Sequence, residues 1–494
     1  MKTMNKYFLL TALIGFASAT YAQDSYDAQT FANSDLNGTA RFVAMGGALG
    51  ALGGDVGVMS TNPAGTAMYR SSDAALSFSG LFSGKAAMGH DASRMSFDQG
   101  GVLIAFDMDE PTNKGLQFVN FGVNYQKKRN FLFNQRTDVQ HLNNTFSQTF
   151  QIADLCNYAS ANDYWGTLAD MSATDEGYHG TILDETGESG AAYAGLPAQQ
   201  AYFEKSTFGS NSQVDVNISF NVSDKFFLGA SVGVYDIDYN RESFYQELGT
   251  DGNQYDFTNW YKTEGDGFDV KLGFICRPIE ESPFRFGVTV HTPIWYRLTD
   301  ANGADLYFND SFMSSASNAD YDYRFRTPWK FGFSLGHTIG QNFAIGAEYE
   351  YQDLSTSHYS EVDGYNSDYF RNMNKITEKT LRGQHTLKVG MEFKPIEALS
   401  LRAGYNFVSS PFKSDAYRII GYDGCYTETD YTNWGAINRF SLGLGYRYKG
   451  GYVDLAWQYQ AQKGDFYAFD DVDLKPTKIK ADRSQLMATF GFRF

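Results

Sequence analysis

The chain of 494 residues has only three cysteines and 10 prolines, and no long apolar run follows its first residues. Cys156, Cys276 and Cys425 are an odd number of cysteines set far apart, so they predict neither a disulfide framework nor a metal cluster. A bridge between Cys156 and Cys425 stays open as an alternative. Nowhere do roughly 18 apolar residues follow one another, and this absence excludes membrane-spanning helices.

Positive charge is scarce as well. Lysine and arginine total 40 against 57 aspartates and glutamates, which gives a formal net charge of −17 at pH 7. So acidic a chain is not expected to bind nucleic acid, whose phosphates require a basic surface. No Ser-His-Asp order and no paired carboxylates stand out, and His291 is a lone histidine near a strand end. We therefore expect no enzyme activity, no cofactor and no metal.

Residues 1–22 have the layout of a secretory signal peptide. A short basic start with Lys2 and Lys6 precedes an apolar run, and the small-residue ending ASATYA comes just before Gln23. Because this segment holds two lysines and no acid, its removal changes the formal charge from −17 to −19. The mature chain is expected to begin at Gln23, outside the cytoplasm.

The rest of the chain is rich in residues that favour strands, with 41 Phe and 34 Tyr, and in glycine, with 49. Apolar and polar residues alternate: Val214 and Val216 are interleaved with Asp215 and Asn217, and 436–449 repeats the pattern. Each such strand has one apolar and one polar face, which suits either a soluble sandwich or a membrane barrel. The lengths of the strands and loops must decide between them.

Fourteen strand-like segments are expected between residues 73 and 494. They lie near 73–82, 97–107, 116–131, 213–222, 225–239, 267–278, 284–298, 321–338, 342–353, 384–395, 398–409, 436–449, 451–462 and 484–494. Short connections such as VSDK and KGG alternate with long polar ones such as 133–212. Outer-membrane barrels sort short turns and long loops to opposite sides, so the pattern predicts an all-β transmembrane antiparallel barrel of about 14 strands.

The final strand, SQLMATFGFRF, alternates apolar with other residues and ends on Phe494. It is similar to the terminal strand that the outer-membrane assembly machinery recognises, which makes Phe494 the expected assembly signal. An ordinary last strand is the alternative.

Residues 23–72 precede the expected barrel of 73–494 and are dense in glycine, which suits close backbone packing inside a confined bore. We expect them to form a plug, or hatch, in the lumen. In an Asn-Pro-Ala turn the side-chain amide of Asn62 is expected to hold a conformation fixed by the proline. The expected hatch residues are Gly46, Gly47, Gly53 and Gly54 and the motif Asn62, Pro63 and Ala64.

The stretch GTARFVAMGGALGALGGDVGVMSTNPAG resembles the N-terminal hatch of the FadL/TodX family, the outer-membrane transporters of long-chain fatty acids and aromatic hydrocarbons. That hatch carries an Asn-Pro-Ala element, which Asn62, Pro63 and Ala64 match. The segments 266–296 and 386–412 are similar to barrel strands of the same family. The resemblance covers most of the chain and implies a hatch-closed barrel of fourteen strands.

What the resemblance implies is passive uptake of hydrophobic molecules across the bacterial outer membrane. Substrate is caught among extracellular loops, enters the barrel and leaves sideways after the hatch shifts. Because burial stabilises an apolar chain by about 0.8 kcal/mol per methylene, an apolar lumen would extract such solutes from water. The expected partners are hydrophobic small molecules, outer-membrane lipids and the assembly machinery, and the chain is expected to be a monomer. A porin or adhesin and an outer-membrane lipid hydrolase are the alternatives.

Three local patterns of apolar or charged residues also carry predictions. Apolar residues at helical spacing within 152–171 predict either a loop helix that packs on its neighbours or a capture groove. The acidic stretch DFYAFDDVD, 465–473, is a solvated loop or a divalent-cation site. Opposite charges on lumen-facing positions are expected to pair across the bore. These positions are Glu348, Lys388, Glu392, Arg402 and Arg439.

Overall fold

The computed structural model describes most of the chain after the expected signal peptide. The described residues are 25–108, 115–140, 142, 147–148, 183–185, 193–195, 197–250, 252–413, 416, 430–469 and 474–494. The expected signal peptide, Cys156, Cys425 and the apolar loop pattern of 152–171 lie outside them.

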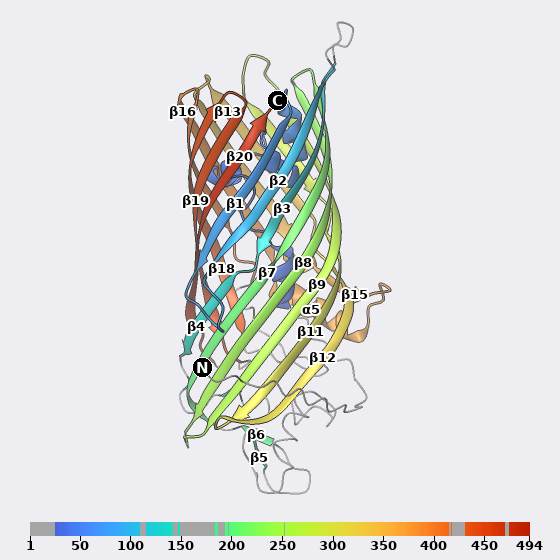
Figure 1. Ribbon diagram of the computed structural model, residues 1–494. Coiled ribbons are helices and arrows are strands. Elements are labelled where there is room, and N and C mark those ends of the chain that lie inside the picture. Colours follow the sequence, from blue (N-terminus) through green and yellow to red (C-terminus); the bar gives the residue numbers. More distant parts are fainter. Residues whose placement is uncertain are drawn as a thin grey trace, which may run out of the picture.

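Long tilted strands form one continuous sheet that curls into a barrel (Figure 1). The wall segments are β1 Asp73–Ser83, β2 Ser93–Asp107, β3 Leu116–Asn130, β4 Phe133–Val139, β7 Ala198–Val222, β8 Phe226–Gly249, β9 Gln254–Cys276, β10 Arg285–His291, β11 Trp295–Phe308, β12 Ser311–Arg326, β13 Lys330–Ile339, β14 Phe343–Asp353, β15 His358–Glu361, β16 Gly383–Ile396, β17 Leu399–Val408, β18 Tyr431–Tyr448, β19 Gly451–Tyr467 and β20 Thr477–Arg493. A separate small hairpin joins β5 Leu183–Glu185 to β6 Tyr193–Gly195.

Four wall strands are interrupted and appear as two segments each: β3 with β4, β10 with β11, β12 with β13 and β14 with β15. The eighteen segments therefore make fourteen wall strands, all antiparallel to their neighbours. The sheet closes where β1 pairs with β20, from Asp73 opposite Arg493 to Ser83 opposite Arg483. The predicted fold class, an antiparallel barrel of about 14 strands, is confirmed.

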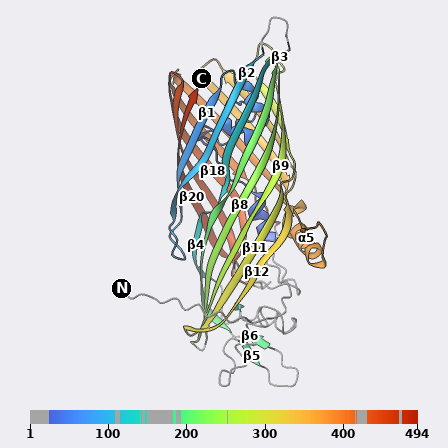
Figure 2. The ribbon, with the colours of Figure 1, turned by 45° about the vertical axis from the view of Figure 1, so that its right-hand side comes forward.

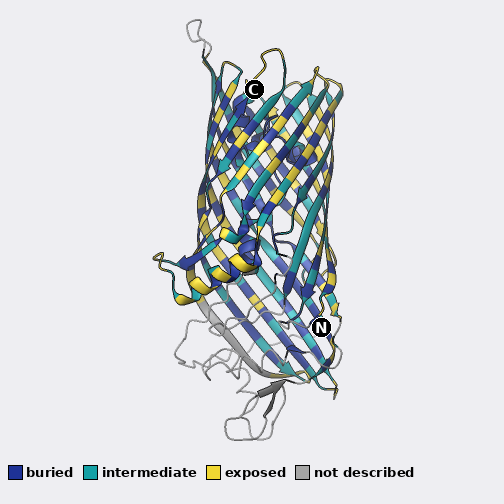
Figure 3. Cartoon of the chain, turned by 180° about the vertical axis from the view of Figure 1, so that it is seen from behind, coloured by how far each residue is buried: buried dark blue, intermediate teal, exposed yellow. Residues whose placement is uncertain are grey.

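The strands place their apolar faces outside and their polar faces inside, the reverse of a soluble sandwich. On β7, Val214 and Val216 are 40% and 58% exposed, whereas Asp215 and Asn217 are 0% and 1% exposed. Figure 3 shows the same alternation of exposed and buried residues around the wall. Outward apolar side chains suit contact with lipid acyl chains. No described helix has the length and apolar character required to cross a bilayer.

The two ends of the barrel differ. The described short turns and the C-terminus lie together at the top of Figure 1. The opposite end, where β5, β6 and the hairpin of β8 and β9 lie, is called here the loop end. The strands β7, β8 and β9 extend into the loop end and have total lengths of 25, 24 and 23 residues. Sequence patterning missed these extensions because strands that rise beyond lipid need no apolar outer face.

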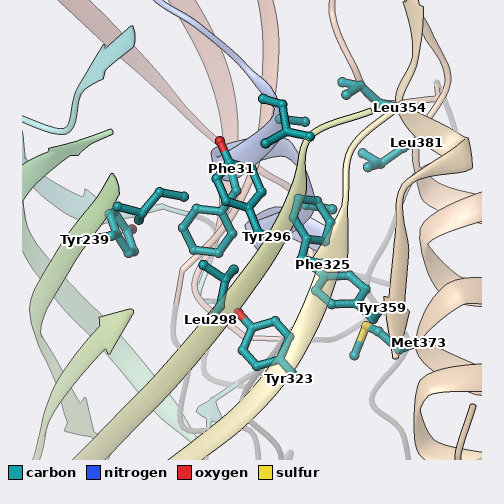
Figure 4. Packing of buried hydrophobic residues seen from close by; sticks show 14 of the residues in the cluster. Phe31, Tyr239, Tyr296, Leu298, Tyr323, Phe325, Leu354, Tyr359, Met373 and Leu381 are labelled. Atoms are coloured by element: carbon teal, nitrogen blue, oxygen red, sulfur yellow. The ribbon is translucent and has the colours of Figure 1, made fainter. Parts of the chain in front are cut away.

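The helices are short. Inside the barrel lie α1 Ser25–Ala32, α2 Ala40–Ala44 and the 3-10 helices η1 Val56–Ser60 and η2 Pro63–Met68; elsewhere are η3 Leu354–Thr356 and α5 Asp368–Thr380. Figure 2 shows α5 at the side of the barrel near the loop end. The buried aromatic cluster of Figure 4 joins α1 to the wall, with Phe31 lying 5.8 Å from the ring of Tyr239 and 6.2 Å from that of Phe325.

Candidate functional site

Residues 25–72, called here the N-terminal segment, run through the bore of the barrel. The segment contacts wall strands on several sides: α2 touches β17, β18, β19 and β20, and η2 touches β3, β7, β8 and β9. At its end it rejoins the wall, because Ser72 and Phe494 exchange two backbone hydrogen bonds of 3.0 Å. The side chain of Phe494 is 61% exposed on the outer surface.

The four glycines singled out in the sequence all adopt left-handed backbone conformations. Their φ angles are +63° for Gly46, +80° for Gly47, +61° for Gly53 and +67° for Gly54. Side chains with a Cβ disfavour this region, so these turns require glycine. Gly46 also lies against β17, where an added Cβ would stand 2.9 Å from the backbone nitrogen of Tyr405.

Glycines on the inner face of the wall allow the backbone of the N-terminal segment to approach closely. They were not predicted from the sequence. A Cβ at Gly404 would stand 2.2 Å from the nitrogen of Gly46, and one at Gly390 would stand 2.2 Å from the oxygen of Met45. Around the Asn-Pro-Ala turn, a Cβ at Gly273 would stand 2.2 Å from Oδ1 of Asn62. These glycines could have been recognised in the sequence, because glycine inside a strand weakens the sheet and often marks a place where another backbone approaches closely.

Asn62 is 1% exposed and hydrogen-bonds in two directions. Its Oδ1 accepts the backbone N–H of Ala64 at 3.1 Å, which caps η2 with Pro63 as the first helical residue. Its Nδ2 donates to the carbonyl of Gly50 at 2.8 Å. The side chain thus ties the turn of η2 to the preceding glycine-rich stretch.

Buried ion pairs also fasten the segment to the wall. Asp35 lies 2.9 Å from Arg483 and 3.8 Å from Arg439. Burial raises the pKa of the Asp35 carboxyl, but the guanidinium groups of Arg483, Arg439 and Arg129 outweigh burial and hold that pKa below its ordinary value. Asp35 was not among the site residues predicted from the sequence.

A second pairing site lies nearer the turn end. Nε of Arg41 is 3.1 Å from Glu392, and its Nη1 donates to the carbonyl of Gly54 at 2.8 Å. Arg402 reaches the same carboxylate at 2.6 Å. One wall carboxylate therefore joins a residue of the segment to a residue of β17.

The luminal charges do pair, but not across the bore. Lys388 meets Glu348 at 2.7 Å from the neighbouring strand, and Arg402 meets Glu392 in the same manner. Arg439 instead reaches the segment through Asp35. The expected geometry was wrong because the N-terminal segment, which contacts β17 to β20 through α2 and β3 and β7 to β9 through η2, lies between opposite parts of the wall.

His291 contacts the segment although the sequence suggested no role for it. The residue is buried at the end of β10, and its Nε2 donates to the carbonyl of Thr61 at 2.7 Å, next to Asn62. A lone histidine near a strand end gave no sign of this contact.

Two cavities are lined in part by residues 29–37 of the N-terminal segment. One of about 110 Å³ is lined mainly by polar and charged groups such as Asp269, Lys271 and Glu350. The other, of about 140 Å³, combines apolar residues such as Phe131, Leu132 and Trp434 with cationic ones. The lumen beside the segment is therefore more polar than the apolar bore that the resemblance suggested, and large apolar clusters lie toward the loop end.

The second cavity adjoins a break in the wall. β3 ends at Asn130 and β4 starts at Phe133, while the hairpin of β1 and β2 stops at Ser83 and Ser93. Beyond that hairpin, β4 pairs with β7 on one side, and none of the described strands pairs with its other side. Asn130, Phe131 and Leu132 at the break line the cavity, as does Ser83.

The acidic stretch at 465–473 is described only in part. Asp465 pairs with Lys478, and residues 470–473 lie outside the described residues. Among the described side chains no group of three or more His, Cys, Asp or Glu has the arrangement of a metal site.

A scan against protein-family models and a search of curated proteins each found no match. Among solved structures the chain is similar to a Pseudomonas aeruginosa FadL homologue, with a TM-score of 0.53 and 14% identity over 94% of this chain and 100% of that one. For the P. putida toluene transporter TodX the TM-score is 0.52, with 12% identity over 93% and 99% of the two chains. For the CymD monoaromatic hydrocarbon channel it is 0.50, with 10% identity over 92% and 97%. The predicted resemblance is confirmed at the level of structure: the chain has the fold of the FadL homologue and of TodX.

Proposed function

We propose that the chain is a bacterial outer-membrane channel for the passive uptake of hydrophobic molecules, with the N-terminal segment as its hatch. The observation that carries this proposal is that the N-terminal segment lies inside the barrel and is held there by Asp35, Arg41 and Asn62, which does not suit the open bore of a general porin. The solved structures of the same fold include a toluene transporter and monoaromatic hydrocarbon channels, which supports a hydrophobic cargo. Their transport role also supports a function other than catalysis.

The exit is lateral in this proposal. The polar region around Lys271 and Glu350 offers no favourable burial to an apolar solute. The cavity beside the break between β3 and β4 does, because apolar side chains form part of its lining. Leaving through that break delivers the solute toward lipid without passage through the charged lumen.

The lining of this cavity favours a long-chain fatty acid over an unsubstituted hydrocarbon. Arg129, which forms no ion pair with an acidic side chain in the described part of the chain, lines the same cavity as Phe131 and Leu132. Lys205 and Arg483 also line it but already pair with Asp430 and Asp35. An apolar tail fits the aromatic and aliphatic side chains, and a carboxylate fits the guanidinium group of Arg129. A monomer suffices, because one chain closes the barrel.

The test is to narrow the proposed exit with a larger side chain and to measure uptake of a labelled long-chain fatty acid. Leu132, 5% exposed, lines the cavity, so Leu132→Trp should reduce accumulation of a labelled long-chain fatty acid in cells. Leu486→Trp, at an outward position that is 55% exposed, is the matched control and should leave uptake unchanged. Equal amounts of both variants in the outer membrane must be verified. Normal uptake by Leu132→Trp would place the exit elsewhere.

A further inference from the structure

A larger cavity, of about 370 Å³, opens at the turn end of the barrel, between the N-terminal segment and the wall. Its lining contains seven basic residues and only two acidic ones, Asp224 and Glu392. This composition is unexpected in a chain with a net charge of −17. We call this cavity the basic vestibule.

Four of the seven cations have acidic partners. Arg41 and Lys394 share Glu392, Arg70 meets Asp224 at 2.8 Å, and Arg493 lies 3.4 Å from Asp73. Their charges are thus largely compensated within the protein.

The other three, Arg277, Arg285 and Arg447, form no ion pair with an acidic side chain in the described part of the chain. Arg285 donates to the carbonyl of Leu52 at 3.1 Å, and Arg277 donates to the carbonyls of Glu280 and Ser282. Arg447 lies 5.8 Å from the centre of the ring of Tyr452. All three line one cavity, although they come from three different places along the wall.

The other four cations of the basic vestibule line the same cavity as these three groups. Its two acidic residues already have partners, since Asp224 pairs with Arg70 and Glu392 pairs with Arg41 and Lys394. Partly buried cations that line one cavity repel one another, and an anion that binds between them reduces this repulsion. A guanidinium group presents a planar fork of donors that fits phosphate and carboxylate oxygens, and several converging forks fit a phosphate best.

We propose that the basic vestibule is a binding site for a phosphate group, held by Arg277, Arg285 and Arg447. The phosphate comes either from a free anion or from a phospholipid headgroup at the same membrane surface. The site rests on this local geometry and not on the proposed transport, so its test is independent of uptake.

The test uses the full chain purified in uncharged detergent and titrated calorimetrically with inorganic phosphate at constant ionic strength. We expect saturable binding, weakened at least about tenfold in Arg285→Gln/Arg447→Gln, because two charge-assisted contacts are lost. The matched control is Lys379→Gln/Arg382→Gln, which removes two exposed cations near α5 at the other end and should bind as the wild type does. Each variant is shown to be folded if its unboiled sample migrates differently from its boiled sample on a gel.

A parallel titration with dihexanoyl phosphatidylglycerol distinguishes the two sources. Affinity at least tenfold higher than for inorganic phosphate, with competition between the two, assigns the site to a lipid headgroup; similar or lower affinity assigns it to a free anion. Wild-type protein that binds neither probe saturably, or a folded double variant with unchanged affinity, overturns the proposal.

Discussion

Asn62→Ala tests the hatch most directly, because Asn62 holds the segment without belonging to the wall. The substitution leaves the carbonyl of Gly50 and the N–H of Ala64 without their partner in a site where Asn62 is 1% exposed. An orphaned buried polar group costs about 1 to 3 kcal/mol. A local loss of about 2 kcal/mol increases the open fraction of the segment roughly thirtyfold.

This magnitude is small beside the stability of a closed wall of fourteen hydrogen-bonded strands. We therefore expect the barrel to fold and to keep its heat-dependent gel migration, while amide hydrogen exchange over 50–66 accelerates and fatty-acid accumulation changes. Asn62→Asp is the second variant: it keeps an acceptor for Ala64 but places a buried carboxylate against the carbonyl oxygen of Gly50, so exchange should accelerate at least as much as in Asn62→Ala at neutral pH.

Three results decide the outcome. Faster exchange confined to 50–66, together with altered uptake, supports a hatch. Removal of residues 23–72 should in addition let a small polar solute leak into cells. If exchange and both fluxes match the wild type in correctly inserted variants, the segment is a fixed part of the barrel and the hatch hypothesis fails.

Two further predictions concern assembly and pH. Deletion of Phe494 removes the outward aromatic side chain and the backbone pairing with Ser72, so less protein should reach the outer membrane while export stays normal; unchanged membrane levels on immunoblots would contradict an assembly role. Because the pKa of Asp35 is lowered on folding, its stabilisation is present above the ordinary aspartate value of about 3.9 and is lost as pH falls through the lower folded value. Asp35→Asn should speed exchange over 33–38 at neutral pH and abolish the acid-induced step, whereas the exposed control Asp363→Asn should keep it; an acid step that survives Asp35→Asn refutes this assignment.

The wall was predictable because lipid imposes a strict rule on every strand that crosses it. Outward residues must be apolar and inward ones polar, so period-two alternation located all fourteen wall strands, and most predicted ends near the turns agree with the structure within a few residues. The rule stops where lipid stops. The extended parts of β7 to β9 and the helix α5 lie near the loop end, where packing against loops replaces lipid contact, and alternation carries no information there.

The site was less accessible to sequence reasoning, since it depends on which luminal positions meet the segment. The left-handed glycines Gly46 and Gly53 were visible as a glycine-rich stretch, but their counterparts in the wall, Gly390 and Gly404, are scattered along strands whose alternation they do not disturb. What identifies them is a contradiction within the strand: glycine weakens a sheet, yet here it occupies inward positions that a polar side chain would ordinarily fill. The loss of sheet stability is tolerated where another backbone must approach closely. Inward glycines in an otherwise regular barrel strand therefore indicate a segment packed inside.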